Sequence, residues 1–244
     1  MILLVLAVPA LIGQWLDPRT VGGENVWIKP TKFLVSITVF AITSGWFFGY
    51  VQPARRNSKM MRGTVALLVV AGSFELIYIS WQAANGLPSH FNGTTPFYTI
   101  MYRLMGLGAF LLIATTLPLA WEIARRPAEG LQPAFFASIV IGLVLCFVLG
   151  GSFGGYMSQQ SGHAVGAVGG SAPIIGWNRA GGDLRIAHFM GIHAQQIIPL
   201  IGMLAVRTSS LVAWTAVLAG STFYAVATVA LFVQAINGLP LPLP

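Results

Sequence analysis

An all-α fold, a polytopic bundle of about seven transmembrane helices in a single domain, is predicted by two features of this sequence. The first is the scarcity of charge: only 8% of the 244 residues are charged and 56% are hydrophobic, whereas soluble domains carry about 25% charged residues. The second is that apolar segments follow one another almost from end to end. So few charges cannot cover a surface exposed to water, and we therefore expect most of the surface to face lipid.

Seven apolar segments approach or exceed the roughly 20 residues that a membrane-spanning helix needs. They cover residues 2–16, 33–51, 64–84, 97–123, 134–156, 184–206 and 211–236. The first segment is short, and an interfacial helix or the core of a signal peptide is its alternative interpretation. It lacks a basic N-terminal region and a clear small-x-small cleavage site, so we expect it to be the first span.

Basic residues between the spans predict the orientation of the chain, because cytoplasmic loops carry an excess of Lys and Arg. The loops after spans two, four and six hold Arg55, Arg56, Lys59, Arg62, Arg125, Arg126 and Arg207. This distribution places the N-terminus inside and the C-terminus outside. The net charge of +7 lies in short loops rather than along one stripe, so we expect the lipid bilayer, and no nucleic acid, as its partner.

The three longest connections then lie on the outer side, at residues 17–32, 85–96 and 157–183. A loop longer than about 15 residues is usually functional or disordered. The last of the three is rich in glycine but also contains Ile174, Ile175 and Trp177. This apolar content favours a lid that folds back onto the membrane domain, and it places the working face outside.

The third span contains an acidic residue deep within an apolar segment. Glu75 lies near its middle, and Tyr78 and Gln82 follow three and seven residues later, which puts the three on one face of a helix. Ionisable residues are costly inside a membrane, so this face should point into the bundle. There Glu75 would be protonated or paired with a cation. A structural hydrogen bond to a neighbouring helix is the alternative.

The sixth span is the other polar segment, with Asp183, Arg185, His188, His193, Gln195 and Gln196. Asp183 follows two glycines and is expected to cap the helix. His188 and His193 are five residues apart, so their side chains point about 140° apart. They are therefore better placed to line two edges of one cavity than to bind one ion together. Hydrogen bonding between helices is the structural alternative for each.

The other histidines, His90 and His163, fall in predicted outer loops, where a lone histidine is usually solvated. Imidazole is nevertheless a common ligand for zinc, copper and iron. We therefore consider one metal site, of Cu, Zn or Fe, formed by His188, His90, His163 and Asp183. No spacing among these residues is diagnostic of a metal.

Two further features predict packing rather than chemistry. Cys146 is the one cysteine and lies within an apolar run, so it offers no disulfide within the chain and no cysteine-based metal motif. The glycines near the end of the fifth span form overlapping small-xxx-small pairs, which permit close helix packing. They are Gly150, Gly151, Gly154 and Gly155.

The run from residue 181 to 196, together with Ser89-His90-Phe91-Asn92 and Thr95-Pro96-Phe97, resembles patterns in uncharacterised bacterial multi-spanning membrane proteins. The resemblance covers most of the chain after the first span. It implies a multi-pass protein of the bacterial cytoplasmic (inner) membrane and brings no activity with it. The chain departs from b-type cytochromes, which carry axial histidines on two facing helices, because its intramembrane histidines lie on one span.

Three functions remain open at this point. The first is redox or electron transfer with haem b or a transition metal held by His188 and a loop histidine, in which Arg185 binds a propionate or another anion and Glu75 relays a proton. The second is a transporter, channel or sensor for protons or a small solute. Its lining would be Glu75, Tyr78, Gln82, His193 and Gln196. The third is a membrane enzyme acting on a lipid or quinone.

The candidate residues keep separate roles in these hypotheses. Glu75, His193 and Arg185 are the candidates for catalysis. The cofactor-binding candidates are His188, His90, His163, Tyr78, Gln82 and Gln196. A homo-oligomer, or a subunit of a larger membrane complex, is compatible with each hypothesis. We also expect Glu75 and His188 to face one cavity open to the outer side, because costly polar groups are best tolerated where they share water or a ligand.

Overall fold

The structure is a computed structural model that describes residues 2–172 and 175–242, with side chains described from residue 8 onward. It is nearly all-α, as predicted, with two short antiparallel strand pairs. Within the described residues, five helical segments are long and apolar enough to cross a membrane. They are Ile28–Phe48, Lys59–Ala84, Pro96–Arg125, Pro133–Ser158 and Ser210–Ile236. The predicted count of seven spans is not confirmed.

The chain divides into two compact units, which are described separately. The first unit comprises Met1–Trp46 and Gly63–Leu112, and the second comprises Phe47–Arg62 and Ile113–Pro244. Whether the two act as the single membrane domain expected from the sequence stays a prediction.

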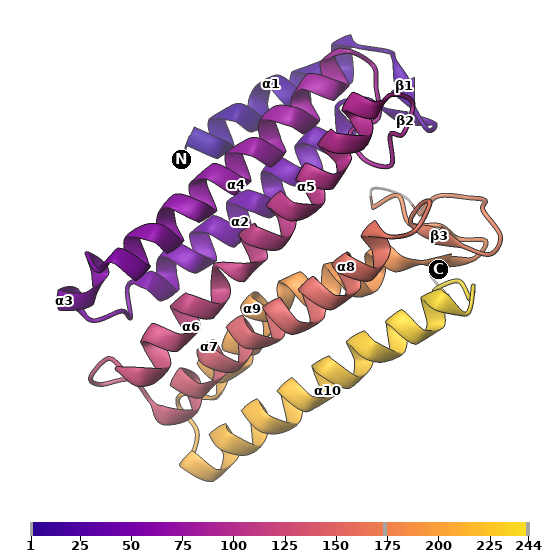
Figure 1. The fold of residues 1–244 in the computed structure, drawn as a ribbon. Coiled ribbons are helices and arrows are strands. Elements are labelled where there is room, and N and C mark those ends of the chain that lie inside the picture. The colour runs from indigo at the N-terminus through magenta and orange to yellow at the C-terminus, as the bar shows by residue number, and fades with distance from the viewer. Residues whose placement is uncertain (1, 173–174, 243–244) are drawn as a thin grey trace. The chain divides into compact units, whose positions relative to one another are not determined.

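The first unit is built from four helices: α1 (Ile2–Leu16), α2 (Ile28–Phe48), α4 (Lys59–Ala84) and α5 (Pro96–Ala114). Figure 1 shows them running side by side, with a hairpin of β1 (Thr20–Val21) and β2 (Glu24–Asn25) at one end. The buried side chains of Tyr78, Ile79 and Met105 form the centre of its core. Phe33, Phe74 and Met101 pack around them.

The hairpin lies in the connection 17–32, which the sequence predicts to be a loop. Helix α2 begins at Ile28, five residues before the predicted span. Gly22 and Gly23 both have positive φ in the turn, a conformation that glycine adopts without a steric cost. Asp17 accepts hydrogen bonds from the side chains of Arg19 and Trp27, and these hold its pKa well below the ordinary value. Pro30 does not delay the helix, because proline is tolerated in a first turn.

The second unit contains the remaining elements. These are α3 (Pro53–Arg56), α6 (Thr116–Arg125), α7 (Pro133–Leu145), the π-helical turn η1 (Cys146–Gly150), α8 (Gly151–Ser158), β3 (Ala164–Val165), β4 (Gly182–Asp183), α9 (Leu184–Ala205) and α10 (Ser210–Ile236). The predicted fifth span is thus interrupted by a π-helical turn, a feature that often marks functional sites. Helix α9 packs against α7, η1, α8 and α10.

At the basic end of the second unit a buried carboxylate organises the arginines. Glu122 is 1% exposed and accepts hydrogen bonds from Arg55 at 2.9 Å and from Arg126 at 2.6 Å. Large apolar side chains form a buried core that includes the neighbouring residue Ile123. Its fully buried members include Phe47, Met61, Ile123, Ile139 and Leu143. Of the basic residues that predicted the orientation, Arg55 therefore also holds α3 to α6, and Arg126 binds the carboxylate from the end of α6 itself.

Glycines bring α9 against the π-helical turn, as the small-residue pairs predicted. A Cβ added at Gly150 would lie 2.8 Å from the Ile192 side chain, and one added at Gly154 would lie 2.7 Å from the His188 ring. Gly155 has nothing within 4 Å of such a Cβ. The prediction of close packing is thus confirmed for Gly150 and Gly154, while Gly155 faces open space.

Candidate functional site

The polar face of α4 points into the first unit, as its spacing predicted. Glu75, Tyr78 and Gln82 are 1%, 6% and 0% exposed, respectively. Their neighbours Ile77 and Trp81, on the other face of the same helix, are more than 60% exposed at 69% and 66%. The helix therefore turns its apolar side outward and its polar side inward, which is the reverse of a water-soluble bundle.

Several buried polar side chains in this interior lack hydrogen-bond partners. Among the described residues, no hydrogen bond of ordinary geometry reaches either Glu75 oxygen, the Tyr78 hydroxyl or Oε1 of Gln82. The Thr38 hydroxyl on α2 is in the same condition. The backbone amide of Ala109 makes only a weaker polar contact with Glu75. An unsatisfied buried polar group costs about 1–3 kcal/mol, and more when charged, so four such side chains in one unit need an explanation.

Helix α5 is shaped to receive the Glu75 carboxyl group. A Cβ added at Gly108 would lie 2.9 Å from Oε1 of Glu75 and 3.3 Å from the Phe74 ring. Any larger residue at Gly108 would displace the carboxyl group from its position. The absence of a side chain at Gly108 thus lets an acidic group reach the backbone of α5.

The connection between α4 and α5 lies over one end of this interior. The Gln82 side chain donates a hydrogen bond to the Pro88 carbonyl at 3.2 Å, and Asn92 donates to the same oxygen at 3.2 Å. Ser89 Oγ lies 3.1 Å from Nδ1 of His90. Gln82 therefore ties the polar face of α4 directly to the loop that carries His90.

Aromatic rings surround the His90 imidazole. Its centroid lies 5.7 Å from that of Phe33 on α2 and 6.2 Å from that of Tyr102 on α5. Phe91 packs on Tyr102 at 5.1 Å and has a φ of +54°, a left-handed conformation that is unusual for a bulky residue. Such strain persists only where the surroundings enforce it, and it concentrates at functional sites.

Lys29, at the start of α2, acts on two ionisable groups of the first unit. Its ammonium acts electrostatically on both Glu75 and His90. Burial, and then the charge of Lys29, hold the pKa of His90 well below its ordinary value of 6.5. His90 is therefore neutral at pH 7, with one ring nitrogen able to donate and the other able to accept.

This depressed pKa has a consequence for stability. Below pH 6.5 the unfolded chain protonates His90 and the folded chain does not, so stability falls as the pH drops, with a limiting slope of about 1.4 kcal/mol per pH unit. We expect wild-type protein in detergent to lose thermal stability between pH 7.5 and 5.5, and His90→Gln to lose less. An identical pH dependence of the two melting temperatures would contradict this assignment.

In the second unit, the polar residues at the start of α9 are held in place by hydrogen bonds and an ion pair with one another and with the preceding loop. Asp183 caps the helix by accepting from the backbone N–H of Arg185 at 3.0 Å, as the sequence predicted. The Arg185 guanidinium binds the same carboxylate at 2.6 Å and the Gly176 carbonyl at 2.6 Å. Asn178 donates its backbone N–H to Asp183 at 2.8 Å and bonds Ala167 with its side chain. This network fixes the long loop to α9.

The histidines of α9 take different positions. His188 places Nδ1 3.0 Å from the Gly150 carbonyl, at the end of the π-helical turn. His193 stacks obliquely on Phe189, with ring centroids 4.2 Å apart. Gln195 is fully buried, and neither atom of its amide has a hydrogen-bond partner among the described residues. His188 thus has the interhelical hydrogen bond that was its structural alternative, while Gln195 is the unsatisfied group.

The predicted metal and haem sites gain no support from this geometry. Within residues 2–172 and 175–242, no group of three or more His, Cys, Asp or Glu side chains is placed to hold a metal ion. Asp183 is occupied by Arg185 and Asn178, and the backbone carbonyl of His163 accepts from Leu184 at 2.9 Å. Metal ligation by His188, His90, His163 and Asp183 therefore stays an unsupported prediction.

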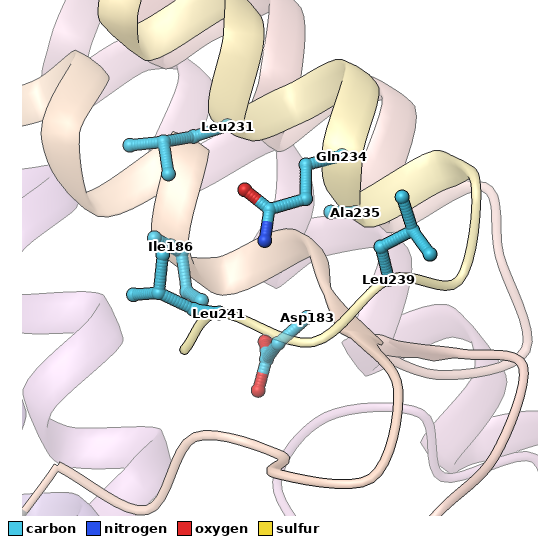
Figure 2. A pocket seen from close by; sticks show the side chains of 7 residues that line it. All are labelled: Asp183, Ile186, Leu231, Gln234, Ala235, Leu239 and Leu241. Atoms are coloured by element: carbon cyan, nitrogen blue, oxygen red, sulfur yellow. The ribbon is translucent and has the colours of Figure 1, made fainter. Parts of the chain in front are cut away.

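In the segment 157–183, which was predicted as a lid, the described residues 157–172 and 175–183 are folded against α9. β3 and β4 pair antiparallel, and Trp177 contacts Phe189 on α9 with ring centroids 5.9 Å apart. Figure 2 shows the adjoining depression, where Asp183 and Ile186 face the last turn of α10 and the segment after it. Gln234 closes it by donating to the Pro240 carbonyl at 2.7 Å. The depression holds no space for a water molecule, so it is a packing contact and no ligand site.

The sequence predicted the polar face of α4 but not the residues that act on it from other helices. Lys29 lies in a connection predicted as a loop, and nothing in a single sequence pairs Gly108 with Glu75. Thr38 gave no signal, because single polar residues in an apolar segment are common, and Gln195 was noted among the polar residues of the sixth span without a role. The expectation that Glu75 and His188 face one cavity stays a prediction, since the two residues belong to different units.

No family model matches this chain, and no curated protein or solved structure matches it.

Proposed function

We propose that this chain is an integral membrane protein that transports protons, alone or together with a small polar solute, through the interior of its first unit. Glu75 is the group that carries the proton. Tyr78, Gln82 and Thr38 are the polar groups that hold water or solute beside it. The interior is reached from the end covered by the loop between α4 and α5.

One observation carries this proposal: Glu75 is a buried carboxyl group without a well-formed hydrogen bond, in the middle of an apolar helix. An acidic residue at the bilayer centre costs roughly 2.5–3.5 kcal/mol on insertion scales. A glutamine or leucine at this position would fold at lower cost. A carboxyl group kept in such a place is explained when it gains and loses a proton, as in the proton relays of membrane pumps and transporters.

The neighbouring groups suit this role. The positive charge of Lys29 acts on both Glu75 and His90, and an opposite charge of this kind would stabilise the carboxylate once its proton has left. Further along α2, Thr38, Thr43 and Ser44 are also buried, and Thr43 donates its hydroxyl to the Val39 carbonyl at 2.8 Å. Hydroxyl groups both donate and accept hydrogen bonds, which is what a chain of water molecules in a narrow passage requires.

The proposed topology has seven spans, with the N-terminus inside and the C-terminus outside a bacterial cytoplasmic membrane. The 22 residues of α9 would extend about 33 Å, enough to cross a hydrocarbon core of about 30 Å. Its polar residues lower its hydropathy, but His188 bonds the Gly150 carbonyl in η1 and Arg185 bonds the Gly176 carbonyl in the long loop. The 15 residues of α1 reach only about 22 Å, so α1 is the span that this proposal supports least.

The proposal is tested in liposomes that contain the purified protein and an internal pH dye. With potassium and valinomycin clamping the membrane potential, a pH step should produce proton uptake faster than in protein-free liposomes. The rate should reverse sign with the direction of the gradient. Rates equal to those of protein-free liposomes under gradients of both directions would overturn the proposal.

A further inference from the structure

An open apolar groove lies on the second unit. It has a volume of about 410 Å³, within the range of about 300–1,000 Å³ typical of ligand sites. Its lining comes from three helices: Met60 from the start of α4, Leu117, Pro118 and Trp121 from α6, and Val140 and Val144 from α7. These side chains offer an occupant no hydrogen bond except through the Trp121 indole, so the occupant's main part must be hydrocarbon.

One end of this groove meets the basic end of the unit. Met60 follows Lys59, and the groove residue Ala124 precedes Arg125. Residues 53–62 and 122–130 together contain six basic and two acidic residues. One of the two acids, Glu122, is buried and already paired with Arg55 and Arg126. The exposed charge beside the groove is therefore positive.

The side chain of Arg125 joins the groove to this charge. Its guanidinium carbon lies 4.9 Å from the centroid of the Trp121 ring, a cation–π arrangement. Trp121 itself is 56% exposed and forms part of the groove wall. Tryptophan at the membrane interface, with arginine directly beyond it, is the arrangement that meets a lipid where its acyl chain joins its head group.

We infer that this groove binds an anionic phospholipid, with an acyl chain along α6 and α7 and the phosphate near Arg125 and Lys59. Charge complementarity favours this occupant over a second apolar helix, because an apolar helix carries no negative group to pair with Lys59 and Arg125. From Leu117 to Ala124 the groove follows α6 for seven residues, or roughly 10 Å, which matches the upper part of an acyl chain. The site would hold lipid whatever is transported in the first unit.

The test uses quenching of Trp121 fluorescence by brominated lipids in reconstituted bilayers. The chain has seven tryptophans, so the Trp121 contribution is taken as the difference between wild type and Trp121→Phe. We expect brominated phosphatidylglycerol to quench this contribution several-fold more effectively than brominated phosphatidylcholine. Arg125→Gln should remove the preference, as should high salt on the unaltered protein, because screening weakens exposed charges.

Arg207→Gln is the matched control, because Arg207 is also exposed and lies near a helix end, two residues after α9, but away from the residues that line the groove. That variant should keep the preference for the anionic lipid. Equal quenching by the two lipids in wild type would overturn the inference. So would the absence of quenching of Trp121 by either lipid, which would mean that a second copy or another protein covers the groove.

Discussion

Replacing Glu75 by glutamine is expected to reduce proton flux in liposomes by roughly 100-fold, or to the leak rate, the order by which positioned proton-transfer groups accelerate reactions. Glutamine has nearly the same shape as glutamic acid, so the contact with Gly108 at α5 survives. What it lacks is a proton that can leave at neutral pH. The measurement is the initial rate of dye response under a fixed gradient, normalised to the amount of protein inserted.

The same variant separates a transport role from a structural one. If Glu75 only supports the fold, Glu75→Gln should lower the melting temperature; if it carries protons, stability should be unchanged or higher, because a neutral amide is cheaper to bury. Glu129→Gln is the control, since Glu129 is exposed in the loop after α6 and should keep wild-type flux. Wild-type flux in Glu75→Gln would refute the role assigned to this residue.

Replacing Gly191 by alanine is expected to destabilise the second unit by about 1–3 kcal/mol, the usual cost of overpacking a tight interface. A Cβ at this position would lie 2.6 Å from the Gly150 nitrogen and 2.7 Å from the Leu149 carbonyl carbon. Both atoms belong to the backbone of the π-helical turn, which cannot move aside as a flexible side chain can. Helix α9 would therefore have to separate from η1.

The chain carries its own reporter for this experiment. Cys146 is buried in η1 and donates its thiol to the Ile192 carbonyl at 3.3 Å. A thiol-reactive dye should therefore label it only when η1 and α9 separate, and should label Gly191→Ala at a lower temperature than wild type. Gly155→Ala is the matched control, because a Cβ there meets nothing within 4 Å. Equal labelling temperatures for Gly191→Ala and Gly155→Ala would contradict the packing argument.

The sequence predicted best where a long apolar segment ends at strong helix-terminating residues. The third predicted span ends at residue 84, as α4 does, before Asn85 and Gly86, and Gly86 has a positive φ. The last span, predicted at 211–236, is α10 from Ser210 to Ile236, with Ser209 as its cap. The inward face of α4 was predictable because a helical period places Glu75, Tyr78 and Gln82 together.

What the sequence did not predict depends on contacts between distant residues. The hairpin β1–β2 is held by side chains of Asp17, Asn25 and Trp27, none of which forms a motif. The predicted span 184–206 matches α9, but the partner of His188, the Gly150 carbonyl 38 residues earlier in the chain, could not be predicted. The aromatic setting of His90 requires Phe33 and Tyr102, which lie on two other helices.

The π-helical turn at Cys146–Gly150 also bears on how this chain should be aligned with any relative. Such a turn holds one residue more than a regular helix of the same length, so it is equivalent to a single-residue insertion. In a regular helix each extra residue would rotate everything after it by about 100°, but the π-helical turn absorbs its extra residue within one turn. A relative with a one-residue gap within 146–150 would therefore have a regular helix there. It would still direct the residues equivalent to Phe153 and Gly154 toward the partners that are Phe232 and His188 in this chain.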